Sequence, residues 1–99
     1  FLQFEFFEQW FALKRYANVS GIQIVGDIPI YVSQNSADVW SHPEVFNLDP
    51  NTGEALEVAG VPPDYFSATG QLWGNPIYNW EYLESTNFDW WVRRVQSVL

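Results

Sequence analysis

The residues best suited to chemistry gather in residues 58–78, which read VAGVPPDYFSATGQLWGNPIY. A proline pair stiffens the chain before the first aromatic residues, and glycines turn it sharply around Trp73. Flat aromatic faces beside carboxylate and amide groups suit a polyol ligand, which offers C–H faces for stacking and hydroxyls for hydrogen bonds. The competing interpretation is that the rings fill a core beneath a long irregular loop. The candidate side chains are Asp64, Tyr65, Phe66, Trp73, Asn75 and Tyr78.

Asp27 is a second candidate, because it interrupts the nearly continuous apolar run of residues 22–32, IQIVGDIPIYV. Such a β-branched run is typical of a strand that is covered on both faces, as in a parallel sheet. Burying a carboxylate without a partner is energetically costly, so a carboxylate in such a run is expected to bind something. In parallel α/β proteins, ligand sites lie at the carboxyl ends of the strands. We therefore predict that Asp27 belongs to a ligand site, against the alternative that it caps backbone amides in a turn.

The remaining polar motifs predict neither a metal site nor a nucleophile. His42 is the single histidine, so we interpret it as a hydrogen-bonding loop residue and not as a metal ligand or a base. Residues 49–53, DPNTG, faintly resemble a calcium loop, but the spacing to a bidentate glutamate fails. We interpret them as the turn of a hairpin over residues 46–58.

The composition favours a neutral ligand. Four basic residues against twelve acidic ones give a net charge of −8, which argues against nucleic acid or an anionic membrane as a partner. The chain has no cysteine, which excludes disulfides and is compatible with the cytosol, and no apolar run approaches the ~20 residues of a membrane span. Aromatic residues make up 19% of the chain, so some apolar surface should face a ligand, a partner or further parts of a larger protein.

The predicted elements follow one α/β order. We expect a helix in residues 1–21, a buried strand in 22–32, a long insertion in 33–87 and a helix in 88–99. Within the insertion we expect one helical turn over 36–40, capped by Ser33 or Asn35, and a short helix over 79–85. The last helix should be capped by Asn87 and carry Arg93 and Arg94 on its polar face. This order predicts one repeat of a (β/α) barrel, with its insertion on the side where such barrels keep their active sites.

Five segments cover essentially the whole chain with familiar motifs: FFEQW…LKRYAN, GDIPIYV, SADVWSHPEVF, VAGVPPDYFSATGQLWGNPIY and FDWWVRR. They closely resemble the 4-α-glucanotransferases, also called amylomaltases or disproportionating enzymes, of the α-amylase-like clan. The pattern AGVPPDYFS…TGQ.WGNP is highly specific. Members of that family are several times longer than this chain. The resemblance therefore implies an internal part of a (β/α)8 TIM barrel: the helix before strand three, that strand, its long insertion and the following helix.

The resemblance also implies roles for single residues. Asp27 would be the site aspartate at the end of strand three, which contacts the sugar next to the scissile bond. Asp64, Tyr65 and Phe66 would belong to a mobile loop that closes over the cleft, where exclusion of water favours transfer over hydrolysis.

On the acceptor side of the cleft, Trp73 would help form the site, and Asn75 is a further implied substrate contact. The family transfers α-1,4-glucan segments by a retaining double displacement that needs no metal and no cofactor. Both principal carboxylates are expected beyond Leu99, so the chain alone should bind glucan weakly and catalyse nothing. Its implied partners are the glucan and the remainder of its own barrel, in the cytoplasm or, for a plant protein, the plastid.

Two alternatives stay open. A free-standing, non-catalytic carbohydrate-binding module would use the same rings, but a lone buried strand with helices on one side argues against a self-contained fold. A truncated fragment that folds poorly and self-associates is the other, because strand edges and apolar helix faces would be exposed.

Overall fold

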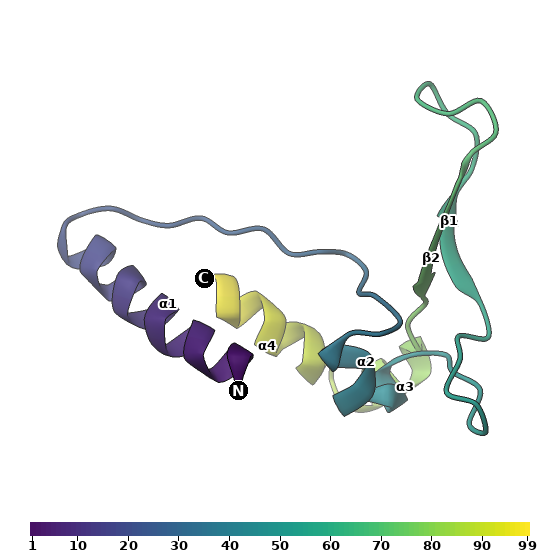
Figure 1. Ribbon diagram of the computed structural model, residues 1–99, viewed down its shortest axis with the longest axis horizontal. Coiled ribbons are helices and arrows are strands. Elements are labelled where there is room, and N and C mark those ends of the chain that lie inside the picture. Colours follow the sequence, from purple (N-terminus) through teal and green to yellow (C-terminus); the bar gives the residue numbers. More distant parts are fainter.

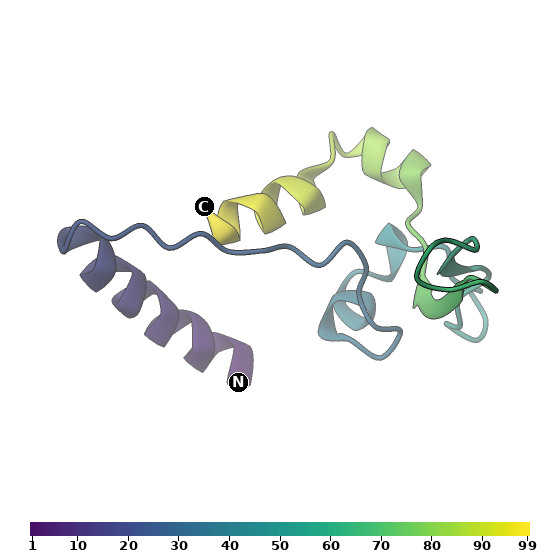
Figure 2. The ribbon, with the colours of Figure 1, turned by 90° about the horizontal axis from the view of Figure 1, so that it is seen from above.

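The computed structural model describes all of residues 1–99 as an open arrangement of helices with one small hairpin at one end (Figures 1 and 2). A long extended segment joins the first helix to the others, and the hairpin projects away from them. The molecule measures 46 × 37 × 27 Å, and nine of its 99 residues are buried. Its elements are α1 (Leu2–Val19), α2 (Ala37–Ser41), the 3-10 helix η1 (Pro43–Val45), β1 (Val58–Val61), β2 (Gln71–Pro76), α3 (Trp80–Ser85) and α4 (Asp89–Val98).

Helix α1 confirms the predicted first helix. It ends at Val19 and is capped by Ser20, whose backbone N–H donates to the Ala17 carbonyl at 3.0 Å, and Gly21 then adopts a φ of +78°. Ala17 is the one buried residue of α1, and large side chains such as Phe4 remain 66% exposed. The apolar side chains of α1 therefore have little cover within these 99 residues. None of the helices combines the length and apolarity that a bilayer span requires.

Residues 22–32 are extended but pair with no other strand in the structure. The expected burial is not realised either, because Val25 is 91% and Ile30 is 62% exposed. A strand acquires its hydrogen bonds from neighbouring strands, and no other segment of these 99 residues supplies one beside it. The barrel strand thus stays a prediction.

The sheet lies instead inside the predicted insertion. Strands β1 and β2 pair antiparallel, with Gly60 opposite Leu72 and a bulge between Val58 and Gly60. The expectation of an irregular loop that turns sharply around Trp73 was wrong, since Trp73 lies within β2. The hairpin expected over 46–58 is reduced to a single bridge, although its turn is confirmed by Asp49 Oδ1, which accepts backbone hydrogen bonds within the 49–53 loop.

The short helices form close to the predicted positions, but their caps differ. Helix α2 is capped by Ser36, whose Oγ accepts from the Val39 N–H at 3.3 Å, and not by Ser33 or Asn35. Asn79 caps α3 through its side chain. The predicted cap of α4 was wrong: α4 begins after Phe88, which has no side-chain cap bond, and Asn87 precedes it with a φ of +54°.

The core lies where η1, α2, α3 and the start of α4 meet the end of the extended segment. Tyr78 is its centre, with ring centroids 5.4 Å from Phe46 and 5.1 Å from Trp91. The interpretation of the aromatic residues as core was therefore right for Tyr78. The buried members of this core are Val32, Val39, Val45, Phe46, Tyr78 and Leu83.

Two glycines of similar backbone geometry allow a test of the hairpin. Gly70 and Gly53 have φ of +77° and +73°, but a Cβ at Gly70 would lie 2.6 Å from the Val61 carbonyl oxygen, whereas a Cβ at Gly53 would meet nothing. We expect Gly53→Ala to cost about 1–2 kcal/mol of stability for the left-handed backbone alone. Gly70→Ala should cost more, because β1 or β2 must also shift.

Hydrogen exchange of the β1 and β2 amides checks this prediction. Gly70→Ala should raise their exchange rates clearly more than Gly53→Ala does. Equal exchange in the two variants would show that the close approach of Gly70 to Val61 does not limit the hairpin.

Candidate functional site

The tip of the hairpin is organised by Asp64. Its Oδ1 accepts hydrogen bonds from the backbone N–H groups of Phe66 and Ser67, each at 2.9 Å, and its own N–H donates to the Ser67 carbonyl. This is the local turn chemistry that aspartate favours. The structure thus gives Asp64 a scaffolding role at the tip, and its predicted contact with substrate stays a prediction.

The turn presents two aromatic rings to solvent. Tyr65 is fully exposed and Phe66 is 91% exposed, and their rings meet edge to face with centroids 6.0 Å apart. Nothing within the chain covers them, and the hairpin carries them away from the helices (Figure 1). Exposed, ordered rings of this kind are suited to contact a ligand or another surface.

Trp73 lies on β2 below the tip. It is 44% exposed, its Nε1 donates to Gln71 Oε1 at 3.0 Å, and its ring meets the edge of Tyr31 at 6.1 Å. Tyr31 in turn stacks on Tyr78 with centroids 5.8 Å apart. Rings therefore continue from the hairpin into the core, which holds the Trp73 side chain in a defined place while leaving part of it accessible.

Asn75 is half-buried, and its side chain points into the molecule. Its Nδ2 donates to the Val32 carbonyl at 2.9 Å. This contact spans 43 residues of sequence and joins β2 to the end of the extended segment. One of its two N–H donors is thus bound to the backbone, and a contact of Asn75 with substrate stays a prediction.

Asp27 lies on the extended segment and is exposed. Its Oδ1 accepts from the adjacent Ile28 N–H at 2.8 Å, which is the backbone contact that the alternative interpretation expects. Its other carboxylate oxygen makes no hydrogen bond within the chain, so it can accept hydrogen bonds from ligand hydroxyls.

The six side chains predicted to contact substrate do not form one closed site within these 99 residues: Asp27, Asp64, Tyr65, Phe66, Trp73 and Asn75. The structure pairs Tyr65 with Phe66 at the tip and places Trp73 and Asn75 on the same strand. Asp27 lies apart from them on the extended segment. A complete cleft would need further surfaces opposite these groups.

Arg94 is the residue that sequence reasoning misplaced. Its guanidinium lies 4.5 Å from the centre of the Trp90 ring and 5.2 Å from that of Trp91, and its Nη2 donates to the Pro29 carbonyl at 2.8 Å. It is thus half-buried against rings and not on a purely solvated helix face. Spacings of three and four residues between these tryptophans and an arginine on one helix were the signal that could have found it.

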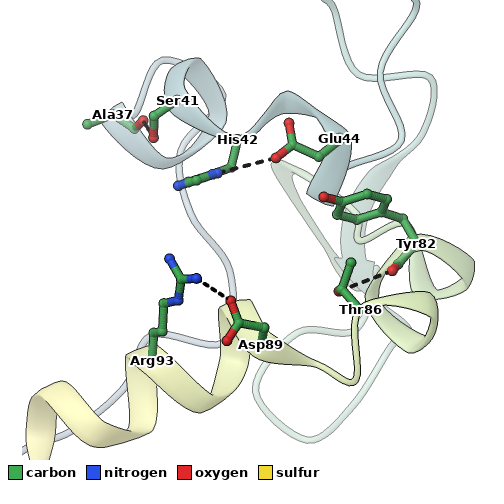
Figure 3. A network of polar contacts seen from close by, with 8 residues as sticks. All are labelled: Ala37, Ser41, His42, Glu44, Tyr82, Thr86, Asp89 and Arg93. Carbon is green, nitrogen blue, oxygen red and sulfur yellow. Dashed lines mark hydrogen bonds and ion pairs between the residues drawn. The ribbon is translucent and has the colours of Figure 1, made fainter.

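A cluster of polar side chains lies where α2 and η1 approach α3 and α4 (Figure 3). His42 Nδ1 is 3.2 Å from Glu44 Oε1, and Arg93 pairs with Asp89 one turn earlier on α4. These side chains are largely exposed, so each pair contributes about 0–1 kcal/mol. The contact agrees with the interpretation of His42 as a loop hydrogen-bonding residue. No group of three or more His, Cys, Asp or Glu side chains is placed to hold a metal ion.

Exposed rings on an ordered hairpin can stack on a ligand, and accessible carboxylate oxygens can accept hydrogen bonds from it. The family model described as 4-alpha-glucanotransferase matches residues 1–99. This chain therefore belongs to the 4-alpha-glucanotransferase family.

Individual relatives agree with this assignment. The chain is 64% identical over 99 residues to a 4-alpha-glucanotransferase of Clostridium butyricum, covering all of this chain and 20% of that protein. It is 53% identical over 96 residues to a chloroplastic/amyloplastic 4-alpha-glucanotransferase of Solanum tuberosum, covering 97% of this chain and 16% of that protein. The chain thus spans a fifth or less of these relatives.

A solved structure supports the fold. The amylomaltase from Streptococcus agalactiae in complex with acarbose matches with a TM-score of 0.83 and 59% identity, over 96% of this chain and 19% of that one. The α/β arrangement described above is thus that of one part of an amylomaltase.

The buried Tyr78 gives a prediction for alkaline pH. Burial raises the pKa of its hydroxyl above the usual 10.0, although the nearby Arg94 charge opposes the shift. The pKa of Tyr78 is higher in the folded protein than in the unfolded chain. The contribution of its protonated hydroxyl to stability is therefore fully present below about pH 10, and it is lost as the pH rises through the folded pKa. We expect the melting temperature of the full-length protein to fall less steeply above about pH 10 in Tyr78→Phe.

Tyr82→Phe is the matched control, because Tyr82 is a tyrosine on α3 that packs against the same core but is only partly buried. Its alkaline profile should follow that of the unmutated protein. Coincident slopes for Tyr78→Phe and the unmutated protein would contradict the prediction.

Proposed function

We propose that the protein containing this chain transfers α-1,4-glucan segments between maltooligosaccharides, or glucans derived from starch or glycogen, by a retaining mechanism. The observation that carries the proposal is the match of residues 1–99 to the 4-alpha-glucanotransferase family. The related amylomaltase structure, solved with acarbose, adds support for a glucan-like ligand. The chain supplies part of the substrate cleft.

In the complete protein, residues 22–32 form strand three of a (β/α)8 barrel. Three observations support this role: the segment is already extended, it is rich in β-branched residues, and it leaves side chains such as Val25 uncovered. Neighbouring strands would satisfy its backbone and cover these side chains. Asp27 then lies near the carboxyl end of the strand, where barrel enzymes bind substrate.

The hairpin tip closes over the bound glucan in this proposal. Tyr65 and Phe66 are exposed, so a bound sugar could stack on them without displacing other side chains of the chain. The Asp64 turn holds the backbone that carries both rings. Stacking on sugar faces and exclusion of water would favour attack by a sugar hydroxyl over attack by water. Trp73 contributes to the acceptor side, lower on the same hairpin.

The two principal carboxylates of the retaining mechanism come from outside residues 1–99. Such a pair stands about 5–5.5 Å apart across the scissile bond. Asp64 does not suit either role, because two backbone N–H groups already bind its Oδ1 at the turn. Asp27 is left to bind hydroxyls of the sugar beside that bond. The reaction needs no metal and no cofactor.

A non-catalytic carbohydrate-binding module is the alternative. It would have to fold by itself, whereas nine of these 99 residues are buried and large apolar side chains cover much of the surface. This exposure is expected of a piece of a larger fold. It also means that the isolated chain is at risk of self-association.

Transfer activity on maltotriose tests the proposal. We expect the full-length protein to release glucose and longer maltooligosaccharides, and the 99-residue chain to release neither. Activity of the 99-residue chain would overturn the assignment of the principal carboxylates to the remainder of the protein. Absence of transfer by the full-length protein would overturn the proposed function itself.

The hairpin tip has its own test in the full-length protein. Replacing both Tyr65 and Phe66 by Ala removes stacking worth roughly 1 kcal/mol per ring, so we expect a loss of about tenfold or more in kcat/KM for transfer. The ratio of hydrolysis to transfer should rise as well, because the hairpin tip without its two rings would no longer exclude water from the bound sugar. The variant Leu72→Ala on the same hairpin is the control, since Leu72 is also exposed, at 80%, but is not a ring. An unchanged hydrolysis ratio in the double variant would contradict the closing role.

A further inference from the structure

Three side chains donate hydrogen bonds to backbone carbonyls just after Asp27. Tyr78 Oη donates to Ile30 O at 2.8 Å, Asn75 Nδ2 to Val32 O at 2.9 Å and Arg94 Nη2 to Pro29 O at 2.8 Å. The chain bends at residues 30–31, in the middle of this group. We call these three donors, Asn75, Tyr78 and Arg94, the carbonyl clamp.

The clamp draws on three parts of the chain. Asn75 lies on β2, Tyr78 sits in the core, and Arg94 comes from α4. Carbonyls that a regular strand would offer to neighbouring strands are here bound by side chains. The end of the extended segment is therefore fixed by the insertion and by α4, whatever pairs with its earlier part.

The clamp acts on Asp27 through a stiff connection. Pro29 has a fixed φ, and the residue before a proline is restricted as well, so few torsions separate the Pro29 carbonyl from Asp27. The Asp27 carboxylate is itself held by the Ile28 N–H at 2.8 Å. Holding the Pro29 carbonyl thus limits where the carboxylate can lie.

Arg94 is suited to this task in a way that lysine is not. Its planar guanidinium contacts the rings of Trp90 and Trp91 and still directs one N–H at Pro29. A lysine ammonium keeps the charge but lacks the planar fork that can stack and donate together. Arg94→Lys therefore separates the geometry of the residue from its charge.

We infer that Asn75, Tyr78 and Arg94 are positioning residues that set the location of Asp27 for glucan transfer, by binding the carbonyls of Val32, Ile30 and Pro29. The inference rests on the proposed function for its catalytic part. Its structural part is that the insertion and α4 hold the segment that carries Asp27.

The test compares Arg94→Lys with Arg93→Lys in the full-length protein. Arg93 is the neighbouring arginine of α4, exposed and paired with Asp89, so it is a matched control for charge and helix position. We expect Arg94→Lys to lower kcat on maltotriose by about tenfold with KM changed less than twofold, since a small misplacement of a residue that orients the substrate can cost up to ~100-fold. Arg93→Lys should leave both values unchanged.

Two further readouts separate positioning from a general loss of folding. In an Asp27→Asn background, Arg94→Lys should add little further loss, because the clamp acts through Asp27. Hydrogen exchange of the Ile28 amide, which donates to Asp27 Oδ1, should rise in Arg94→Lys and not in Arg93→Lys. Additive losses of activity would overturn the catalytic part, and unchanged exchange would overturn the clamp as a whole.

The exchange measurement does not depend on enzymatic activity. If the unmutated protein transfers no glucan, the proposed function and the catalytic part of the inference both fail, and exchange of the Ile28 amide still decides the structural part. If the protein transfers glucan and Arg94→Lys behaves as Arg93→Lys in every readout, the clamp fails and the proposed function stands.

Discussion

The burial of Tyr78 is the interaction on which this arrangement depends. Its ring contacts Phe46, Trp90 and Trp91, and its hydroxyl donates to the Ile30 carbonyl, so one side chain joins the extended segment, η1 and α4. A buried hydroxyl must find a partner, since an unmet hydrogen bond costs about 1–3 kcal/mol. The need to satisfy that group therefore selects one relative placement of segments that are distant in sequence.

The hairpin is stable for a different reason. Its turn is closed by local contacts of Asp64 with Phe66 and Ser67, and Gly70 permits the close approach of β1. It can therefore project into solvent without a core of its own. A hairpin with a fixed base and an exposed tip is suited to ligand binding, because the rings stay accessible while the backbone that carries them is ordered.

The extended segment shows the opposite dependence. Residues 22–32 have the apolar pattern of a barrel strand, but Val25 stays 91% exposed and no ladder forms. Pairing is a property of two strands, so an isolated segment cannot display it. The clamp residues nevertheless hold its far end. In our inference, the insertion and α4 therefore help to set the position of Asp27 before any neighbouring strand is considered.

The sequence by itself determined the local features and the family. Helix α1, the helical turns near 37 and 80, the Asp49 turn and the motif around Asp64 all follow from signals within a few residues of each other. Only the tertiary structure decided that Asn75 and Arg94 point inward, that Tyr78 is core while Tyr65 is exposed, and that 58–78 is a hairpin. The clamp contacts join residues that are 43, 48 and 65 positions apart in the sequence. Whether a side chain points inward therefore depends on distant partners that no local sequence pattern encodes.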